Sequence, residues 1–478
     1  MSQAAWPDGF ETAVVDLLGD RFTRDPAQLE AYGKDWTKVY APAPSAVAFV
    51  RSTEEVAALL RLCHANEVAV VPSGGRTGLA GGAVAKNGEV VVSLERMRAI
   101  EPVDALARTV RCQAGAVTAV VHEHCAEAGL TWPVDFASSG QSQIGGNIAT
   151  NAGGVRVVRY GLTRQWVLGL QVVTMTGEVL ELNGDLEKNN TGIDLRQLFI
   201  GSEGTLGIIT EATLKLAPLP KASRVALLAV ADLRRALDVF LSARQRSDFD
   251  LLAFEYLTDE CLQLVLNDIG VPHPLSTPGH AYVLVEIEIP TDDIAEAAES
   301  WLADLFEQGL AVDGVLAASQ SQSSELWSFR ERVSETLSKT GFIHKNDVSV
   351  PVRRLADFVD DMFAAFSERY PHFQIYFFGH IGDGNLHVNV MKPADMLTEA
   401  FLDQCHGTDQ VLFELINKHR GSISAEHGIG LLKKSFLGYS RTPAEIALFR
   451  SIKKTFDPNG LLNPGKVFDT TASAGDSP

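Results

Sequence analysis

Residues 379–390 read GHIGDGNLHVNV, and this stretch carries the strongest structural signal in the chain. Asp383 and Gly384 stand between two apolar runs. An Asp-Gly pair in this setting predicts a β-hairpin, because a type I′ turn needs positive φ at both central residues. With these two residues as the loop, His380 is predicted to pair directly with His387, so that both imidazoles point to the same face.

This pairing predicts a metal or catalytic role for His380 and His387. Asn389 lies two residues beyond His387 and shares its face of the strand. Two imidazoles beside an amide suit a zinc-type ion, which also needs at least one ligand from elsewhere. The alternative is a loop in which both histidines make only ordinary hydrogen bonds.

A second candidate site lies in residues 422–430, SISAEHGIG. Glu426 offers a carboxylate ligand directly beside His427, whose imidazole can titrate near neutral pH. The neighbouring glycines predict a tight backbone turn here rather than a helix interior.

The composition is typical of a globular protein in water, with 46% hydrophobic and 21% charged residues. The 478 residues amount to about three domains' worth of chain. Lys and Arg number 41 against 60 Asp and Glu, a formal net charge of −19. This charge argues against nucleic acid as a partner, because phosphates demand a basic footprint, and it disfavours docking on an anionic membrane surface.

The cysteines are odd in number and scattered, without a CxxC pair: Cys63, Cys112, Cys125, Cys261 and Cys405. This pattern predicts reduced thiols in a cytoplasmic protein. The first residues, MSQAAWPDGFET, have neither the basic nor the apolar region of a signal peptide. No apolar run approaches the roughly 18 residues needed to span a bilayer.

Three glycine-rich regions dominate the first half of the chain. Strands are predicted at 46–50 and 68–72 with a helix at 53–66 between them, and the loop 73–78, SGGRTG, follows. It matches neither G-x-G-x-x-G nor the Walker pattern, so neither a nicotinamide cofactor nor ATP is favoured. The second and third regions are 133–154 and 198–209. So many glycines are expected where backbone must lie against a large flat ligand.

Further elements are predicted along this half. Strands are expected at 90–94 and 109–113, a helix at 117–128 and a hairpin at 167–182. The helix contains His122 and His124, but residues two apart on a helix point in roughly opposite directions, so a shared ligand role is disfavoured.

The second half predicts an α+β domain with a largely antiparallel sheet. From 224 to 318 the expected order is strand, helix, strand, helix, at 226–230, 233–246, 281–289 and 294–308. A helix at 326–337 is expected to carry Arg330 and Ser334 on one face. Lys345 falls in a strand at 342–350, and further helices are expected at 359–369, 405–419 and 443–456.

Six ordered motifs together resemble a known superfamily of flavoenzymes. Three of them resemble the FAD-binding domain of the vanillyl-alcohol oxidase and p-cresol methylhydroxylase superfamily: PSGGRTGLAGG at 72–82, SQIGGNIATNAGG at 142–154 and QLFIGSEGTLGIIT at 197–210. The others resemble the C-terminal half of its 2-hydroxy-acid dehydrogenases: GHIGDGNLHVNV, AEHGIG at 425–430 and DPNGLLNPGK at 457–466. The match spans nearly the whole chain. The stretches 31–38, 159–169 and 345–351 point to the members that oxidise D-2-hydroxyglutarate.

The resemblance implies an α+β fold with a two-lobed FAD-binding domain at 1–220 and an α+β substrate domain at 221–425. A C-terminal helical segment at 426–470 returns to the flavin, and 471–478 form a disordered tail. The implied FAD-binding residues come from the glycine-rich motifs and the C-terminal segment: Pro72, Ser73, Gly74, Gly75, Arg76, Thr77, Gly78, Leu79, Pro133, Gly140, Gly145, Gly146, Asn147, Thr150, Asn151, Gly153, Gly154, Gly204, Ile209 and Asn463. No histidine occurs in 72–82 or 138–154, so the FAD is expected to be non-covalent.

The resemblance also implies roles at the reacting end. His380, His387 and Glu426 match the ligands of a divalent metal, zinc before others, and His427 matches the general base. The substrate-binding positions are Arg330, Ser334, Lys345 and Asn389. Ser334 stands where the family is expected to have threonine, and the hydroxyl is kept. A surface ion pair is the alternative for Arg330.

The implied reaction is metal-assisted oxidation of D-2-hydroxyglutarate to 2-oxoglutarate, with D-malate as a second candidate substrate. The alternatives are a D-lactate or glycolate dehydrogenase of the same superfamily, a flavin-dependent synthase of the ether-lipid type and a non-catalytic flavin-binding protein. An electron-transfer flavoprotein or the quinone pool is the implied electron acceptor, and a homodimer is a further expectation.

Overall fold

The computed structural model describes residues 6–37, 39–220 and 222–470. The chain forms two compact units. The first unit combines the chain up to Gly154, Leu162–Leu219 and the chain from Glu426 onward, and the second combines Val155–Gly161 with Pro220–Ala425. Compared with the predicted domains, 155–161 and Pro220 fall in the second unit instead of the first, and the segment from Glu426 is grouped with the first unit. The predicted disordered tail, 471–478, lies outside the described residues.

The first sheet of the first unit has the order β1-β2-β4-β3. Strands β2 (Ala46–Phe49), β4 (Val90–Ser93) and β3 (Val70–Ser73) are parallel, and β1 (Phe22–Thr23) is antiparallel to β2. Helix α3 (Thr53–Ala65) connects β2 to β3, as predicted, and the Ser52 side chain caps it by accepting from the Glu55 amide. All four residues of β2 and of β4 are buried, so these strands form the centre of the core.

The second sheet of this unit is antiparallel, with the order β5-β9-β7-β8. Strands β5 (Thr109–Gln113), β7 (Val167–Val173) and β8 (Val179–Leu182) fall where the sequence predicted them, and β9 is Ile208–Lys215. Gly177 has a φ of +75° in the turn between β7 and β8. The strands β6 (Leu130–Thr131) and β10 (Ala217–Pro218) form a separate small sheet.

The C-terminal segment belongs to this unit and extends its first sheet. Leu462 pairs in parallel with Val70 of β3, and the Asn463 amide donates to the Val70 carbonyl at 2.7 Å. The predicted helix is present as α15 (Pro443–Phe456). Its buried Lys453 donates to the carbonyls of Thr205 and Leu462 at 2.7 and 2.5 Å. These bonds fix the segment against the glycine-rich loops.

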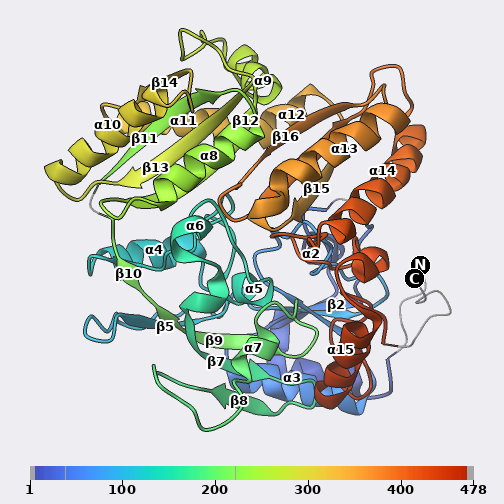
Figure 1. Ribbon diagram of the computed structural model, residues 1–478. Helices are drawn as coiled ribbons and strands as arrows, with labels where there is room; N and C mark the ends of the chain where they lie inside the picture. Colours follow the sequence, from blue (N-terminus) through green and yellow to red (C-terminus); the bar gives the residue numbers. More distant parts are fainter. Residues whose placement is uncertain (1–5, 38, 221, 471–478) are drawn as a thin grey trace. The chain divides into compact units, whose positions relative to one another are not determined.

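The second unit is built on a sheet of seven antiparallel strands in the order β14-β11-β13-β12-β16-β17-β15 (Figure 1). The strands are β11 (Ser223–Val230), β12 (Asp250–Thr258), β13 (Ala281–Glu288), β14 (Asp313–Leu316), β15 (Ile343–Ser349), β16 (Gln374–Gly379) and β17 (Asn385–Met391). This confirms the predicted antiparallel α+β fold.

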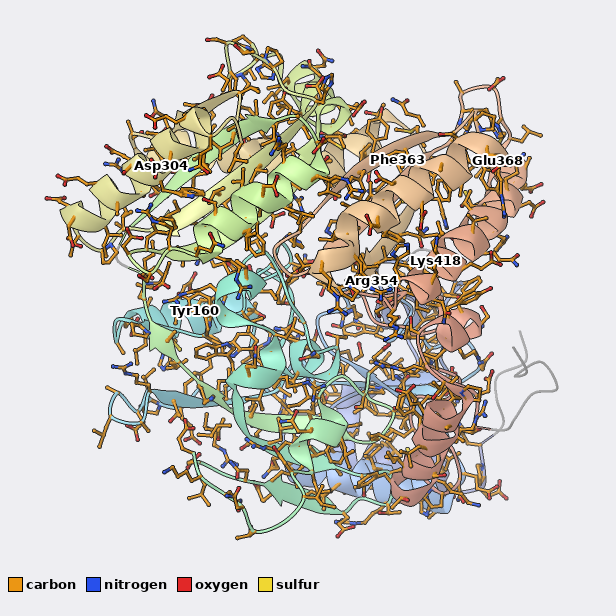
Figure 2. All side chains as sticks on the ribbon, in the orientation of Figure 1. Tyr160, Asp304, Arg354, Phe363, Glu368 and Lys418 are labelled. Atoms are coloured by element: carbon orange, nitrogen blue, oxygen red, sulfur yellow. The ribbon has the colours of Figure 1, made fainter. Side chains whose placement is uncertain are left out.

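Helices cover both faces of this sheet. Helices α9 (Asp259–Ile269), α11 (Gln320–Glu331) and α12 (Val333–Thr340) bury one face, whose apolar core includes Leu257, Tyr282 and Phe378. On the other face lie α8 (Leu233–Arg244), α10 (Asp292–Glu307), α13 (Leu355–Arg369) and α14 (Thr398–Lys418) (Figure 1). Arg354 and Lys418, labelled in Figure 2, lie close together beside α13 and α14, and Arg354 Nη1 donates to the Lys418 carbonyl at 3.4 Å.

Several short elements complete the fold: α1 (Phe10–Leu18), α2 (Pro26–Tyr32), α4 (Thr118–Ala126), α5 (Ile144–Ala149), α6 (Val157–Tyr160) and α7 (Arg196–Phe199). The 3-10 helices are η1 (Gly19–Arg21), η2 (Thr163–Trp166), η3 (Val352–Arg354) and η4 (Lys434–Tyr439). Among the described residues, no helix combines the length and the apolar character needed to cross a bilayer.

Two predictions for the second unit were wrong. The order strand, helix, strand, helix omitted β12 and α9, because the charged and aromatic residues of β12 conceal its alternation. The predicted single helix at 326–337 is broken between α11 and α12, whose shared boundary residue is Arg332. The break separates Arg330 from Ser334: Arg330 is buried, whereas Ser334 is exposed.

The hairpin register was also predicted wrongly. Phe378, not His380, lies opposite His387. The loop is longer than two residues and begins after the end of β16 at Gly379. Gly384 has a φ of +90°, whereas Asp383 has no positive φ, so the turn is not type I′. The register differs by two residues, and because side chains alternate with a period of two, His380 and His387 still share a face.

Candidate active site

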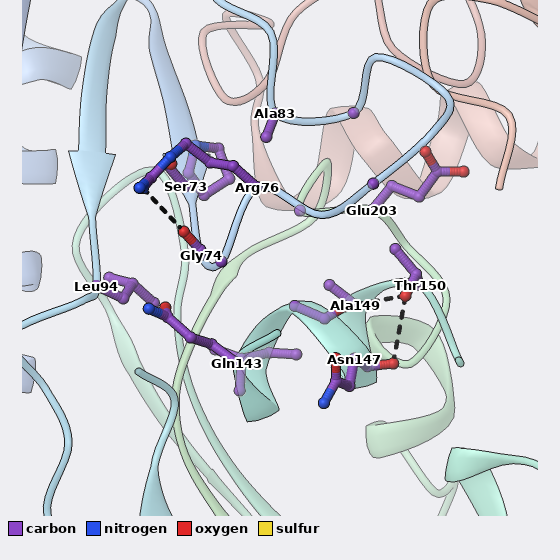
Figure 3. Close-up of a pocket in the computed structure, with 18 of the residues that line it drawn as sticks. Ser73, Gly74, Arg76, Ala83, Leu94, Gln143, Asn147, Ala149, Thr150 and Glu203 are labelled. Carbon is purple, nitrogen blue, oxygen red and sulfur yellow. Dashed lines mark hydrogen bonds between the residues drawn. The ribbon is translucent and has the colours of Figure 1, made fainter. Parts of the chain in front are cut away.

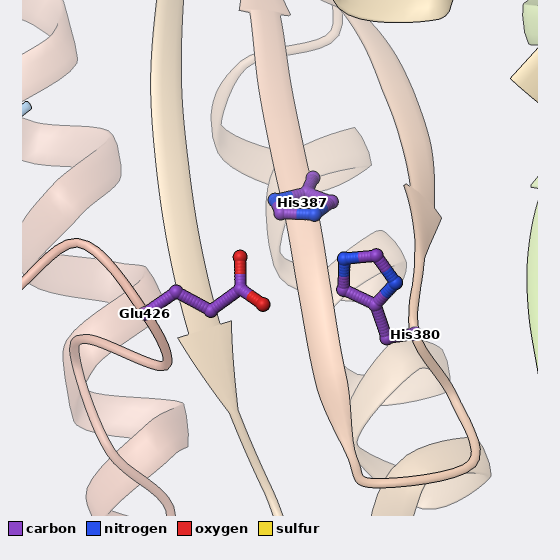
Figure 4. A group of neighbouring side chains, drawn as sticks. All are labelled: His380, His387 and Glu426. Carbon is purple, nitrogen blue, oxygen red and sulfur yellow. The ribbon is translucent and has the colours of Figure 1, made fainter. Parts of the chain in front are cut away.

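Three side chains converge into a candidate metal site. His380, His387 and Glu426 each offer one ligand atom, and these atoms lie within 4.8 Å of one another (Figure 4). His380 is buried, while His387 and Glu426 are half-buried. Two imidazole nitrogens and one carboxylate oxygen are the donor set that zinc favours when a coordination position is left for water or substrate.

The hairpin and the loop before Glu426 position these ligands. His387 lies on β17, and His380 follows the last residue of β16, with their ring centroids 5.4 Å apart. Glu426 directly follows Ala425, whose amide donates to Asp347 Oδ2 at 3.2 Å. Asp347 lies on β15, directly opposite His387. The loop is therefore held beside the strand that carries a histidine ligand.

Each histidine faces a buried carboxylate through its other ring nitrogen. His380 Nδ1 donates to Glu255 Oε1 at 2.5 Å, and His387 Nδ1 lies 3.6 Å from Asp347 Oδ1. Burial alone would raise the pKa of Glu255, but the electrostatic interactions with His380 and Arg330 and the hydrogen bond from His380 outweigh it and lower that pKa to about 2. Such outer partners set which nitrogen of a histidine meets the metal.

The four predicted substrate residues are distributed over four elements, α11, α12, β15 and β17. Arg330 on α11 pairs with Glu255 through Nε at 2.8 Å, and its guanidinium carbon lies 4.6 Å from the centre of the Phe378 ring. The alternative of a surface ion pair was wrong, because Arg330 is 7% exposed. Lys345 on β15 lies directly opposite Asn389 on β17.

The Lys345 ammonium points back toward α12. Its Nζ donates to Ser338 Oγ at 3.1 Å. Ser338 in turn donates to the Ser334 carbonyl at 2.8 Å, one helical turn earlier. Ser334 itself is exposed. The structure therefore links Lys345 to α12 through Ser338 rather than through the predicted Ser334 hydroxyl.

A cavity in the first unit brings the glycine-rich motifs together (Figure 3). Its empty volume is about 930 Å³, including space open to solvent. The predicted cofactor residues that line it are Pro72, Ser73, Gly74, Gly75, Arg76, Thr77, Gly78, Gly145, Gly146, Asn147, Thr150, Gly204 and Ile209. His427 also lines this cavity. The motifs lie far apart in sequence, and the fold of one unit joins them.

The cavity wall is shaped by backbone. A Cβ on Gly75 would lie 2.2 Å from the Gln141 carbonyl oxygen, and one on Gly145 would lie 2.6 Å from the Ala114 Cβ. The lining also contains buried polar atoms without a hydrogen-bond partner in the described part of the chain: Asp35 Oδ2, Ser73 Oγ and Gln143 Oε1. Orphaned buried polar atoms beside an open cavity indicate a ligand with polar groups.

Seven of the predicted cofactor residues do not belong to the lining of this cavity: Leu79, Pro133, Gly140, Asn151, Gly153, Gly154 and Asn463. Gly154 is needed for packing, since a Cβ there would lie 2.1 Å from the Asp135 carbonyl oxygen. Asn151 accepts a bond from the Arg164 amide at 3.0 Å. Asn463 Nδ2 donates to the carbonyls of Gly82 and Glu203 at 3.0 and 2.7 Å.

Glu203 anchors the loop that carries His427. Its carboxylate accepts from the amides of Ile429 and Gly430 at 2.7 and 2.8 Å. Gly428 has a φ of +80° and Gly430 a φ of +49°, which confirms the predicted tight turn. Burial raises the pKa of Glu203, and the two amide bonds oppose that rise.

Sequence reasoning did not assign roles to several of these residues. Asp35, Gln143 and Glu203 lie inside the motifs at 31–38, 142–154 and 197–210. These motifs marked the region, but no individual role followed for the three residues. Asp347 likewise lies within 345–351. Glu255 had no local signal, because β12 itself was missed. His122 and His124 bond separately to the carbonyls of Val134 and Glu101 at 3.1 and 3.0 Å.

The sequence of this chain matches two families of FAD-binding proteins and several dehydrogenases. Residues 219–467 match the family described as FAD linked oxidases, C-terminal domain, and residues 44–183 match the FAD binding domain family. A D-2-hydroxyglutarate dehydrogenase of Stutzerimonas stutzeri is 49% identical over 93% of this chain and 95% of its own length. The one from Xanthomonas citri pv. viticola is 48% identical over 94% of both chains.

A solved structure shows the fold. The p-cresol methylhydroxylase structure superimposes with a TM-score of 0.74 over 97% of both chains at 16% identity. This likeness confirms the expected α+β fold of the vanillyl-alcohol oxidase and p-cresol methylhydroxylase type. Together, the family matches and the relatives at almost half identity show that this chain belongs to the D-2-hydroxyglutarate dehydrogenase family of FAD-linked oxidases.

Proposed function

We propose that this protein oxidises D-2-hydroxyglutarate to 2-oxoglutarate with bound FAD and a divalent metal ion. The observation that carries the proposal is the pair Glu426-His427. Glu426 belongs to the candidate metal cluster, and His427 lines the glycine-walled cavity. Two residues adjacent in the sequence therefore belong to the candidate metal cluster and to the lining of the candidate cofactor cavity. The relatives named as D-2-hydroxyglutarate dehydrogenases support the substrate.

The residues present fit both groups. His380, His387 and Glu426 would hold zinc, because the set of two nitrogens and one oxygen suits that ion. The glycine-walled cavity, with its orphaned polar atoms, would hold non-covalent FAD. When bound, the metal supplies polarisation that lowers the pKa of the substrate hydroxyl, and the FAD supplies the acceptor for the hydride from the α-carbon.

The chain itself supplies the base and the anion-binding groups. His427 would take the proton from the substrate hydroxyl at its imidazole. Arg330 and Lys345 would bind the distal carboxylate, Arg330 through its guanidinium fork and Lys345 as a point charge. Asn389, directly opposite Lys345 in the sheet, would add an amide to the same face. The exposed Ser334 would add a hydroxyl.

Several further features are part of the proposal. We expect an electron-transfer flavoprotein or the quinone pool to accept the electrons, because no nicotinamide motif occurs in the sequence. A homodimer and a cytoplasmic location are also proposed. All five cysteines are buried and free, which agrees with a reducing compartment.

An anaerobic screen tests the proposal. The purified flavoprotein is mixed with D- and L-enantiomers of 2-hydroxyglutarate, malate and lactate, and with glycolate, while flavin absorbance is followed. Fast bleaching by D-2-hydroxyglutarate, slower bleaching by D-malate and little by the L-enantiomers is expected. No bleaching by any of these acids would contradict the dehydrogenase proposal.

The second candidate function is a D-lactate or glycolate dehydrogenase. A monocarboxylate needs no cation for a distal carboxylate, so it gives no role to Arg330 and Lys345. In the same screen, D-lactate or glycolate bleaching the flavin faster than D-2-hydroxyglutarate would favour this candidate. A synthase without net oxidation would turn over without any external electron acceptor.

A further inference from the structure

We propose that Glu255 is a positioning residue that couples the metal-binding histidine His380 to the anion-binding Arg330, so that one carboxylate orients both halves of the substrate site. This inference rests on the proposed function, and it adds a residue that does not itself touch the substrate.

The geometry gives each carboxylate oxygen of Glu255 its own partner. Oε1 accepts from His380 Nδ1 at 2.5 Å, and Oε2 accepts from Arg330 Nε at 2.8 Å. Glu255 is fully buried on β12, in the middle of the seven-stranded sheet. Because a strand in that position cannot shift easily, the carboxylate gives two other elements a common fixed point.

The bond to His380 determines which nitrogen can meet a metal. With Nδ1 donating to Glu255, the lone pair that remains for coordination is on Nε2. The negative carboxylate also increases the basicity of the imidazole, which strengthens a bond to a cation. Without Glu255, the ring could rotate or change tautomer, and the ligand set would lose its defined geometry.

The bond to Arg330 determines the plane of the guanidinium. The Nε–H is fixed by Glu255, and the ring of Phe378 lies 4.6 Å from the guanidinium carbon. Four further N–H groups of the fork remain on the two Nη atoms. A planar fork held at one edge and on one face is preorganised to bind a carboxylate end-on, which limits the entropy lost on binding.

Burial makes this arrangement sensitive to substitution. A buried charge is tolerated only while it is paired, and removing one partner leaves the other uncompensated. Replacing the Glu255 carboxylate would leave Arg330 and His380 without a common acceptor. Both functions should then weaken together, although neither residue has been changed.

Asp347 provides a matched comparison. It is 1% exposed, and it lies 3.6 Å from the Nδ1 of the other histidine ligand, His387. Asn385 Nδ2 and the Ala425 amide also donate to it, at 2.7 and 3.2 Å. Within the described part of the chain, the carboxylate that pairs with Arg330 is that of Glu255. Asp347 should therefore support the metal ligands without orienting the anion-binding fork.

The test measures two quantities in metal-stripped holoflavoprotein. The first is the Kd for zinc, obtained by competition with a chromogenic chelator. The second is the KM for D-2-hydroxyglutarate at saturating zinc, which removes any effect of weak metal binding. The variants are Glu255→Gln, Glu255→Asp and Asp347→Asn. Flavin absorbance and Tm check that each variant is folded, and Glu255→Asp keeps the buried charge in case Glu255→Gln does not fold.

The expected results differ between the two carboxylates. All three variants should bind zinc about 10- to 100-fold more weakly, the usual consequence of losing an outer partner of a ligand. At saturating zinc, both Glu255 variants should show a KM raised about tenfold with little change in kcat, the signature of lost binding that is shared by ground state and transition state. Asp347→Asn should raise the KM less than either Glu255 variant does under the same conditions, because Asp347 makes no ion pair with Arg330 among the described residues.

Three outcomes separate this inference from the proposed function. Folded Glu255 variants with the wild-type zinc Kd and KM would overturn the inference and leave the function intact. A raised zinc Kd with a normal KM in the Glu255 variants would overturn the coupling to Arg330. Wild-type protein that binds no zinc, or whose flavin D-2-hydroxyglutarate does not bleach, would overturn the proposed function itself.

Discussion

The glycine-walled cavity and the candidate metal cluster are built in opposite ways. Backbone shapes much of the cavity wall: a Cβ at Gly75 or Gly145 would lie within 3 Å of neighbouring atoms. The cluster is made of side chains, since His380 and His387 each meet a buried carboxylate. A backbone-built site is damaged when atoms are added, and a side-chain-built site when atoms are removed. Substitutions can therefore distinguish the two.

Metal removal should have the largest effect and should act on the cluster alone. Stripping the protein with a chelator is expected to slow flavin reduction by D-2-hydroxyglutarate about 10⁴-fold, because a bound metal contributes several kcal/mol of charge stabilisation. FAD should remain bound, and added zinc should restore the rate. Stopped-flow absorbance measures the rate. If metal-free protein reduces its flavin at the normal rate, the histidines are not ligands.

His427→Ala removes the residue that joins the two regions in sequence. Flavin reduction is expected to slow about 10³-fold, within the range of positioned general bases, while FAD content and zinc affinity stay normal. The matched control is His124→Ala, since His124 lies on α4 and bonds only to the Glu101 carbonyl among the described residues. Equal rates in the two variants would remove His427 as the base.

Lys345→Met tests the anion-binding side of the cluster. Loss of a charged hydrogen bond costs about 1.5–3 kcal/mol, so the KM for D-2-hydroxyglutarate should rise about 10- to 100-fold with a smaller change in kcat. The control is Lys339→Met on α12, where Lys339 is exposed and pairs with Glu335. Steady-state kinetics of both variants measure the KM for D-2-hydroxyglutarate. A similar KM in both variants would show that Lys345 does not bind the substrate.

Gly146→Ala should have the smallest effect and should act on the cavity alone. An added Cβ at Gly146 meets no atom within 4 Å, so the protein should fold normally. Because Gly146 lines the cavity, the methyl group should reduce FAD affinity about tenfold, as modest overpacking does. Gly438→Ala, also open and outside the cavity lining, is the control. Fluorescence titration of apoprotein with FAD measures both, and identical affinities would contradict the assignment.

The cavity was easier to predict from the sequence than the contacts around the metal cluster. The cavity is built from backbone loops, whereas the cluster depends on side chains that are distant in sequence. Glycine-rich loops are local signals, so the motifs at 72–82 and 142–154 could be read from the sequence, and the cavity joins them. The hairpin histidines were also predicted from a local signal. The predicted register was wrong by two residues, but the two rings still lie side by side. The contacts of Glu255 were not readable, because its partner His380 lies 125 residues away.

The sequence by itself determined the strands and helices with clear periodicity, the glycine loops, and the histidines that would share a strand face. These follow from short-range rules of backbone conformation and side-chain alternation. Only the tertiary structure decided that Arg330 is buried against Glu255, that α11 and α12 are separate helices, and that Asp347 holds the loop before Glu426. Those facts depend on which distant strands become neighbours in the sheet, and no local pattern encodes that choice.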